Sequence, residues 1–330
     1  MHRVRSASPR CHRVQLACAA IAVLALAAQA FAQKAAAPPA PALATPVAGP
    51  SGPSGTLDRI RQAGRIKLGY RADARPLSYR DESGKPAGYS VELCQRIIEA
   101  AKGDLGLAEL SIEWVPVMAE NRYQALQQGE VDLLCGAESV TLTRRHDVSF
   151  SIPIFPGGIG ALLRADAPAQ LREILSGSTP KTGPVWRGNA QILQSKTFSV
   201  VASTTAEKLL AEKLAEFKLA SKVAPVDGYE QGVQRLLDRK CDVFFGDRAI
   251  LLDAAKRSPA GKELAVLDRM FTYEPLALAL PRGDEDFRLA VDRAISRLYR
   301  SGEIRTLYAK WCGEPDANAV GFFQWNAPPD

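Results

Sequence analysis

The chain has 330 residues, of which 46% are hydrophobic and 24% are charged, and its formal net charge at pH 7 is +6. Four of the positive charges are arginines near the N-terminus, and without them the net charge is about +2. Because no cluster of lysines and arginines with interleaved aromatic residues remains, the composition argues against a nucleic-acid partner.

The first 32 residues have the pattern of a secretory signal peptide. A basic region precedes an apolar stretch over residues 16–28, which is short for a membrane span, and Ala30-Phe31-Ala32 has the spacing of a cleavage site. The basic residues are Arg3, Arg5, Arg10 and Arg13. We therefore predict that the chain is exported and cleaved near Ala32.

Residues 33–55 consist mainly of alanine, proline, glycine and serine, with Lys34 as their single charge. This composition predicts a disordered linker. The folded part is expected to begin near Thr56, which leaves about 270 residues, enough for two lobes or one large α/β domain. No apolar run in this part approaches the length of a transmembrane helix.

After Thr56 the sequence alternates β-rich runs with helical periodicity. Strands are predicted over residues 65–70, 110–117 and 131–135, and helices over residues 89–101 and 120–128. This β-α-β-α order is typical of a mainly parallel sheet covered by helices.

A second set of alternating elements follows the glycines at positions 157 and 158. Strands are predicted over residues 197–202, 221–226 and 241–245, and helices over residues 206–218, 229–239 and from Arg248 onward. Residues 272–280 are apolar and extended, and an amphipathic helix is predicted over residues 284–300. The sequence thus contains two α/β blocks.

Four cysteines remain after removal of the signal peptide: Cys94, Cys135, Cys241 and Cys312. An even number in an exported chain makes two disulfides plausible. We pair Cys94 with Cys135 because both fall in the first α/β block, which leaves Cys241 with Cys312. Free thiols and the other pairings remain open, since connectivity does not follow from sequence.

The most informative segment runs from Cys135 to Arg145, directly after the strand over residues 131–135. It combines the hydroxyls of Ser139 and Thr141 with the guanidinium of Arg144 at an expected helix start. A guanidinium can bind a carboxylate through two hydrogen bonds, and the free N–H groups of a helix start favour an anion. The alternative is that Arg144 makes a surface salt bridge and Thr141 caps a helix.

This segment also carries a family resemblance. A Val-Asp-Leu strand, a turn rich in small and hydroxyl residues, an arginine, and then Val148-Ser149-Phe150-Ser151 resemble the polar amino-acid-binding proteins of bacterial ABC transporters, solute-binding protein family 3. The Cys135-Gly136 opening is most similar to the glutamate/aspartate-binding branch. The resemblance covers residues 57–311 and departs chiefly over residues 176–196.

The resemblance implies an α/β, two-lobed periplasmic-binding-protein fold (type II), in which each lobe is a mainly parallel sheet flanked by helices and two hinge crossings join the lobes. Residues 56–158 and 274–330 would form the first lobe, and residues 159–273 the second. It also implies a periplasmic protein that closes on a free amino acid and delivers it to a membrane-embedded permease. We expect a monomer that needs no cofactor and no metal.

The resemblance places ligand-binding residues in the second lobe as well. Residues 202–207 resemble the family's strand-end turn, in which Thr204 and Thr205 would bind the same carboxylate as Arg144. Asp247 matches the family aspartate that accepts hydrogen bonds from the α-ammonium. The alternatives are structural: Thr204 and Glu207 have the spacing of a capping box, and Asp247 could cap the next helix.

Selectivity is expected in the segment from Gly69 to Tyr79. Arg71 stands where glutamate/aspartate-binding relatives carry the arginine that meets the side-chain carboxylate, and Tyr79 could flank the ligand. Two positions depart from that branch, Tyr229 in place of a histidine and Ile159 in place of a hydroxyl. Glutamate or aspartate is therefore the first expected ligand, and a neutral polar amino acid is the second.

An enzyme is the main alternative. His146 is the only histidine after the signal peptide, which argues against a multi-histidine metal site, and neither a G-x-S-x-G motif nor a P-loop occurs. The glycines at 157, 158 and 160 lack dinucleotide-binding spacing and suit an interlobe crossing. Cyclohexadienyl dehydratases use the same fold with a pocket carboxylate as general acid. The sequence nominates no carboxylate over Asp247, whose expected ammonium partner would keep it ionised. We expect a binding protein and not an enzyme.

Overall fold

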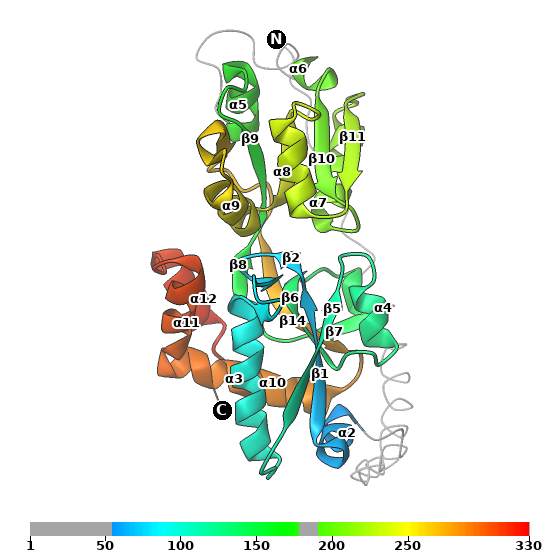
Figure 1. The fold of residues 1–330 in the computed structure, drawn as a ribbon, viewed down its shortest axis with the longest axis vertical. Helices are drawn as coiled ribbons and strands as arrows, with labels where there is room; N and C mark the ends of the chain where they lie inside the picture. The colour runs from blue at the N-terminus through cyan, green and yellow to red at the C-terminus, as the bar shows by residue number, and fades with distance from the viewer. Residues whose placement is uncertain (1–54, 178–190, 330) are drawn as a thin grey trace, which may run out of the picture. The chain divides into compact units, whose positions relative to one another are not determined.

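Residues 55–177 and 191–329 are described in the computed structural model (Figure 1). The predicted signal peptide and almost all of the predicted linker lie outside these residues. Within the described part, none of the helices is long and apolar enough to cross a bilayer. The described residues form two lobes, each built on one β-sheet that is flanked by helices, as predicted.

The first lobe contains a six-stranded sheet with β1 between β5 and β6. These three strands are parallel, whereas β14 is antiparallel to β6, β7 and β8. The strands are β1 (Arg65–Arg71), β5 (Ser111–Val117), β6 (Leu133–Ser139), β7 (Val148–Phe150), β8 (Phe155–Gly157) and β14 (Glu274–Pro281). A small antiparallel sheet follows β1 in the chain and contains β2 (Asp73–Ala74), β3 (Ser78–Arg80) and β4 (Pro86–Ala87).

The helices of the first lobe are amphipathic where they cover its sheet. In α10 (Glu285–Ser301), Phe287, Val291 and Ile295 repeat every four residues and are buried, because this spacing places them on one face. Asp284 caps the helix by accepting a hydrogen bond from the Phe287 N–H, 3.1 Å away. The other helices are α2 (Thr56–Ala63), α3 (Tyr89–Asp104), α4 (Arg122–Gln127), α11 (Glu303–Cys312) and α12 (Ala317–Trp325).

The second lobe contains a five-stranded sheet in the order β11-β10-β12-β9-β13. β10 is parallel to β11 and β12, whereas β9 is antiparallel to β12 and β13. The strands are β9 (Ile159–Arg164), β10 (Thr197–Val201), β11 (Lys222–Val226), β12 (Val243–Asp247) and β13 (Leu264–Val266). The helices are α5 (Ala169–Ser176), α6 (Gln191–Gln194), α7 (Thr205–Glu216), α8 (Tyr229–Leu237) and α9 (Arg248–Arg257), with the 3₁₀ turn η2 (Gly261–Glu263).

The chain crosses between the two sheets twice, from β8 to β9 and from β13 to β14. The two crossings pack against each other without room for side chains at the glycines. A Cβ atom on Gly158 would lie 2.2 Å from the carbonyl oxygen of Thr272, and one on Gly157 would lie 2.8 Å from that of Glu274. The glycines over residues 157–158 are therefore required by backbone contact between the crossings.

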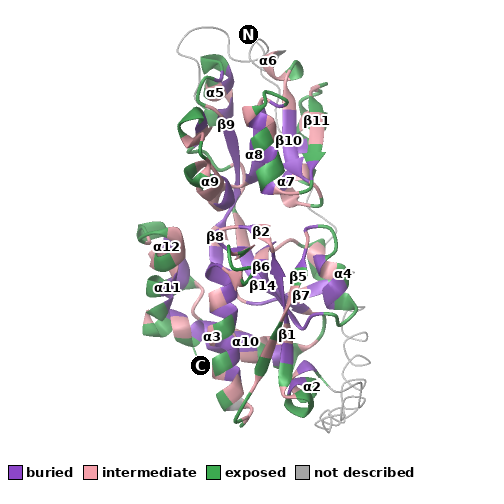
Figure 2. Ribbon diagram, in the orientation of Figure 1, coloured by how far each residue is buried: buried purple, intermediate pink, exposed green. Residues whose placement is uncertain are grey.

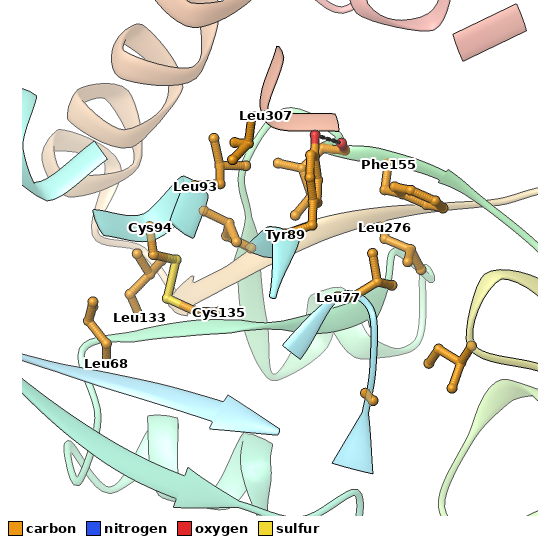
Figure 3. Packing of buried hydrophobic residues seen from close by; sticks show 14 of the residues in the cluster. Leu68, Leu77, Tyr89, Leu93, Cys94, Leu133, Cys135, Phe155, Leu276 and Leu307 are labelled. Atoms are coloured by element: carbon orange, nitrogen blue, oxygen red, sulfur yellow. Dashed lines mark hydrogen bonds between the residues drawn. A yellow bond between two sulfur atoms is a disulfide. The ribbon is translucent and has the colours of Figure 1, made fainter. Parts of the chain in front are cut away.

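Burial follows the central strands of both sheets, such as β6, β9 and β10, which are mostly purple in Figure 2. In the first lobe, the largest fully buried side chain is Tyr89, the first residue of α3. Its hydroxyl donates a hydrogen bond to the Ile154 carbonyl oxygen, 2.8 Å away, while its ring packs edge-on against Phe155 (Figure 3). The buried hydroxyl is thus satisfied, as a polar group in an apolar core must be.

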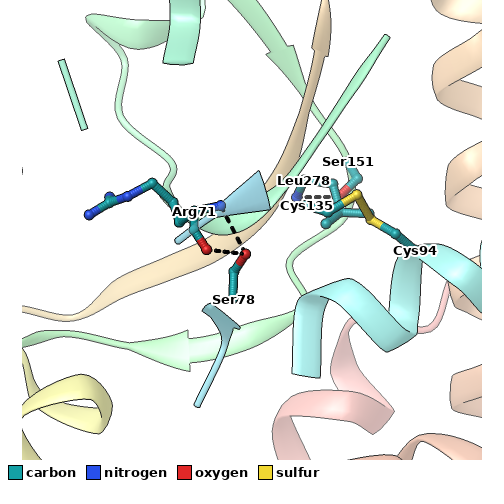
Figure 4. Close-up of a disulfide and its surroundings, with 6 residues drawn as sticks. All are labelled: Arg71, Ser78, Cys94, Cys135, Ser151 and Leu278. Atoms are coloured by element: carbon teal, nitrogen blue, oxygen red, sulfur yellow. Dashed lines mark hydrogen bonds between the residues drawn. A yellow bond between two sulfur atoms is a disulfide. The ribbon is translucent and has the colours of Figure 1, made fainter. Parts of the chain in front are cut away.

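The predicted disulfide between Cys94 and Cys135 is confirmed (Figure 4). It joins α3 to β6 with a Cα–Cα distance of 6.1 Å. A bridge that closes a loop of this length contributes about 2–4 kcal/mol, mainly by restricting the unfolded chain. It fixes the strand that leads into the segment from Cys135 to Arg145.

The predicted disulfide between Cys241 and Cys312 is wrong, because both thiols are free. Cys241 precedes β12, whereas Cys312 ends α11. Burial, with a further contribution from the charge of Asp247 at the other end of β12, raises the pKa of the Cys312 thiol to about 12. Cys312 thus lies toward the end of β12 away from Cys241. The extended stretch from Cys241 to Asp247 spans roughly 20 Å, and a disulfide bridges Cα atoms no more than about 7 Å apart.

The expected helix start beside Arg144 is also corrected. Residues Arg144–His146 form only one 3₁₀ turn, η1. Thr141 Oγ1 accepts a hydrogen bond from the Arg144 N–H, 3.1 Å away, so Thr141 closes the turn through its side chain. Arg144 therefore presents its guanidinium without a helix dipole behind it.

Candidate ligand-binding site

One small cavity is lined by residues of both lobes. Six of the eight predicted ligand-binding residues line it: Arg71, Ser139, Arg144, Thr204, Thr205 and Asp247. The cavity lies at the carboxyl ends of β1, β6, β10 and β12, where α/β folds place ligand groups. Its volume is about 30 Å³.

Arg144 contributes a guanidinium that has no carboxylate partner among the described residues. Its Nη1 donates a hydrogen bond to the Ser139 carbonyl oxygen, 2.9 Å away. The guanidinium carbon lies 5.2 Å from the centre of the Tyr123 ring, within range of a cation–π contact. These contacts fix the side chain, and its guanidinium forms no ion pair with a described residue.

Arg71, at the end of β1, is only 4% exposed and is already paired within the chain. Its Nε donates a hydrogen bond to Asp73 Oδ1, 2.8 Å away, and its Nη2 lies 2.7 Å from the same oxygen. Ser78 holds the backbone of Arg71 through two hydrogen bonds (Figure 4). The side chain thus faces the cavity from a fixed position.

A buried ion pair between Arg122 and Glu138 supports this wall, and the sequence analysis did not predict it. The Arg122 Nε donates to Glu138 Oε2 at 2.6 Å, and the Tyr123 hydroxyl donates to the same oxygen at 2.8 Å. Burial alone would raise the pKa of Glu138, but the charges of Arg122, Arg144 and Arg71 hold it below its usual value. Glu138 is therefore ionised, and its negative charge interacts with all three guanidinium groups.

The N-terminus of α7 forms part of the opposite wall. Thr204, Thr205 and Ala206 line the cavity there. The Thr204 hydroxyl donates to the Val201 carbonyl oxygen at 2.6 Å and does not cap the helix. The capping box is therefore not formed, and the first N–H groups of α7 keep their partial positive charge toward an anion.

Asp247 ends β12 and caps α9. Its Oδ1 accepts hydrogen bonds from the N–H groups of Ala249 and Ile250, at 2.9 and 3.4 Å. Burial, with the nearby charge of Glu274, raises the pKa of Asp247 to about 7 even though the two N–H groups act in the opposite direction. The cap uses one carboxylate oxygen, so the predicted cap and an ammonium-binding role are compatible.

Glu274, the first residue of β14, brings a second carboxylate to the cavity. It accepts hydrogen bonds from the hydroxyls of Thr205, at 2.6 Å, and Thr272, at 2.9 Å. Because Thr205 belongs to α7 and Glu274 to the first sheet, this contact joins the two lobes. The sequence analysis had placed Glu274 only in an extended stretch.

Comparison with known proteins agrees with this architecture. The sequence profile of bacterial extracellular solute-binding proteins, family 3, matches residues 66–314. The chain belongs to this family. It is 29% identical over 263 residues to the L-glutamate/L-aspartate-binding protein of Pseudomonas aeruginosa, covering 79% of this chain and 81% of that protein.

Two further proteins extend this comparison. The chain is 26% identical to the glutamate/aspartate import solute-binding protein of Salmonella typhimurium, covering 79% of this chain and 80% of the relative. Its fold matches the crystal structure of an ancestral amino acid-binding protein, a precursor of cyclohexadienyl dehydratase, with a TM-score of 0.64. That match has 23% identity and covers 78% of this chain and all of the other. The two-lobed, type II fold predicted from the sequence is confirmed.

Two of the predicted ligand-binding residues do not line the cavity. Tyr79, in β3, packs against Trp311 and under the guanidinium of Arg75, and it lines a neighbouring groove. Thr141 accepts the hydrogen bond that closes η1. No group of three or more side chains suited to metal ligation occurs within the described residues.

Proposed function

We propose that the chain is the extracytoplasmic substrate-binding component of an amino acid ABC transporter. It would bind a polar amino acid, glutamate or aspartate, in the cavity and deliver it to a membrane-embedded permease, with no covalent step. The glutamate/aspartate-binding relatives in two bacteria support an acidic ligand. Consistent with this role we propose a periplasmic monomer, with lobes at residues 56–158 and 274–330 and at residues 159–273.

The observation that carries this proposal is the position of the Arg144 guanidinium in the cavity wall. It lines the cavity, is held by Ser139 and Tyr123, and has no carboxylate partner among the described residues. A charge in that position is stabilised by an anionic ligand, and a guanidinium suits the two oxygens of an α-carboxylate. The uncapped start of α7 would bind the same carboxylate from the other lobe.

The α-ammonium would bind on the acidic side of the cavity. Asp247 and Glu274 both line it and lie close enough for the charge of Glu274 to raise the pKa of Asp247. A ligand ammonium between them would relieve that repulsion and keep Asp247 ionised. Because the ligand's partners come from both lobes, it would stabilise the closed arrangement over the open one.

Thermal unfolding of the purified chain with each common amino acid tests the proposal, and calorimetry then gives the affinity. A ligand at 100 times its Kd should stabilise the chain by about 2.7 kcal/mol, which is seen as a higher Tm. Arg144→Ala should weaken binding roughly 30-fold or more, since a carboxylate in the closed site would lose its countercharge.

Arg145→Ala is the matched control, because Arg145 is exposed in the same 3₁₀ turn and does not line the cavity. It should leave the affinity unchanged. An Arg144→Ala chain that binds as tightly as the wild type would disprove the site.

The raised pKa of Asp247 favours one second candidate, a lyase that uses this carboxyl as general acid. Prephenate and arogenate belong in the same screen for this reason. A dehydratase would convert them to product at a rate that depends on Asp247, whereas a binding protein would only be stabilised by its ligand.

A further inference from the structure

The short hairpin formed by β2 and β3 reaches from the first lobe to the second outside the interlobe cavity. β2 packs against α8. Arg75, which follows β2, pairs with Asp253 in α9, with 3.4 Å between Arg75 Nε and Asp253 Oδ1. Neither Asp73 in β2 nor these two residues line the cavity. The hairpin therefore contacts the second lobe at positions that a ligand in the cavity does not occupy.

Asp73 uses one carboxylate oxygen within its own lobe and turns the other toward α8. Its Oδ1 accepts a hydrogen bond from Arg71 Nε, 2.8 Å away. Its Oδ2 is buried and has no hydrogen-bond partner within the described part of the chain. A Cβ atom on Gly228, the residue before α8, would lie only 3.1 Å from Oδ2. The second oxygen thus lies against the start of α8.

The start of α8 is positively polarised and lacks a side-chain cap of its own. Gly228 occupies the N-cap position, and no side chain makes the capping hydrogen bond. The first N–H groups of a helix keep a partial positive charge that a nearby carboxylate stabilises. Burial is the main cause of the raised pKa of Tyr229, the first residue of α8, and the charge of Asp73 contributes to it. The negative charge of Asp73 therefore acts at this helix start.

We propose that this hairpin holds the two lobes closed, with Asp73 interacting with the positive end of α8 and Arg75 pairing with Asp253. The inference goes beyond the proposed function, because these contacts involve no ligand, and it uses that function only as a readout of closure. A ligand that binds the closed arrangement has an apparent Kd equal to its intrinsic Kd divided by the closed fraction. Loss of a closure contact therefore weakens every ligand by the same factor, whereas loss of a ligand contact changes selectivity.

Gly228 allows this contact to be blocked without straining the backbone. Its φ of -159° is extended and open to any residue. Alanine there adds one methyl group, which would lie 3.1 Å from Asp73 Oδ2 and so keep the hairpin from seating against α8. In an Asp73→Ala chain the carboxylate is gone, and the added methyl group should have room. The substitution at Gly228 should therefore weaken ligand binding only when Asp73 is present.

Calorimetry with L-glutamate and L-glutamine on the purified chain tests the contact with α8. Gly228→Ala should raise both Kd values by the same factor, roughly 3- to 30-fold. In the Asp73→Ala background, the same substitution should change either Kd by less than about 2-fold. Gly103→Ala is the matched control and should leave both Kd values unchanged. Gly103 is an exposed helical glycine whose added Cβ would have no neighbour within 4 Å.

Arg75→Ala tests the contact with α9. Asp253 keeps its ion pair with Arg257, at 2.6 Å, so this variant leaves no unpaired carboxylate. Because 41% of the Arg75 side chain is exposed, the loss of affinity should be smaller, up to about 5-fold, and equal for both ligands. Arg61→Ala removes an ion pair of similar exposure within α2 and should change neither Kd.

Small-angle X-ray scattering without ligand separates this inference from the proposed function. Gly228→Ala should have a larger radius of gyration than the wild type. A wild-type chain that binds no amino acid would disprove the proposed function, while the comparison of radii would still decide the closure contact. Equal radii, or an equal loss of affinity from Gly228→Ala in the Asp73→Ala background, would overturn the inference. A changed ratio of the glutamate and glutamine Kd values in Gly228→Ala would overturn it too, because the substitution would then act on a ligand contact.

Discussion

The two walls of the cavity use different chemistry for the same purpose. The first lobe contributes three arginine side chains, Arg71, Arg122 and Arg144, and the second contributes a helix start, two hydroxyls and Asp247. The arginine wall carries full charges that need countercharges when the cavity is closed. The second wall presents partial charges on backbone N–H groups, and these partial charges need no countercharge.

This difference indicates how the site is kept stable without a ligand. Two of the three arginines form ion pairs within the chain, with Asp73 and Glu138, whereas Arg144 forms no ion pair with a described residue. The second wall can meet an anion through α7, while its Asp247 and the Glu274 of the first lobe face the ammonium. A zwitterionic ligand thus fits the charge difference between the walls.

Removal of Glu138 should have the largest effect, because the arginine wall depends on it. Glu138→Ala leaves Arg122 buried without a countercharge, and we expect the free energy of unfolding to fall by about 3–5 kcal/mol. Urea denaturation followed by circular dichroism would measure this change. A loss below about 1 kcal/mol would show that the ion pair does not support the wall.

Glu113→Ala is the matched control for that experiment. Glu113 pairs with Arg65 at 3.7 Å, but 48% of its side chain is exposed. Exposed pairs contribute at most about 1 kcal/mol, so this variant should be nearly as stable as the wild type. A large loss in both variants would mean that burial of the pair does not decide its contribution.

The acidic side of the cavity should give binding a pH dependence. Without ligand, the pKa of Asp247 is raised to about 7, so below that pH the carboxyl is protonated and cannot pair with an ammonium. The Kd for glutamate should therefore rise up to about tenfold per pH unit as the pH falls from 7 to 5.5, where glutamate itself stays ionised. Calorimetry over this range measures it.

Without ligand, Asp247 should make the free energy of unfolding change with pH in the direction opposite to that of a carboxylate held in an ion pair. Between pH of about 4 and about 7, the folded chain holds a proton on Asp247 that the unfolded chain has lost, so the free energy of unfolding should fall as the pH rises. Asp247→Asn keeps a capping side chain and should remove the pH dependence of the Kd and this contribution to the pH dependence of stability. If the slope of Kd persists in that variant, another group is responsible.

Much of the fold follows from local patterns in the sequence. The β-α alternation and the Cys94–Cys135 bridge were predicted correctly because strand and helix periodicity are local and α3 precedes β6 in the same lobe. The Cys241–Cys312 pairing failed because it required the distance between the two ends of β12 and the position of α11, which only the tertiary structure defines.

The site was predictable where a residue follows a strand. Arg71, Thr204 and Asp247 all occur at carboxyl ends of strands, and these ends meet at the cavity. Arg122 was missed because an arginine at a helix start resembles a solvated one. Glu138 was missed because the predicted strand ends at Cys135, whereas β6 continues to Ser139 and buries this carboxylate.

The smallest predicted effect concerns the backbone of the second wall. Ser203 precedes the uncapped start of α7 with a φ of 59°, a left-handed conformation that glycine adopts without strain. Ser203→Gly should raise the free energy of unfolding by about 0.5–1 kcal/mol, after allowance for the greater entropy of the unfolded chain. Lys218→Gly, at a φ of 52° after the end of α7, should give a similar gain away from the cavity.

Because the N–H groups of α7 do not change, the Kd for glutamate should stay within about 3-fold in both variants. A loss of affinity confined to Ser203→Gly would show that the serine holds the second wall in its binding geometry.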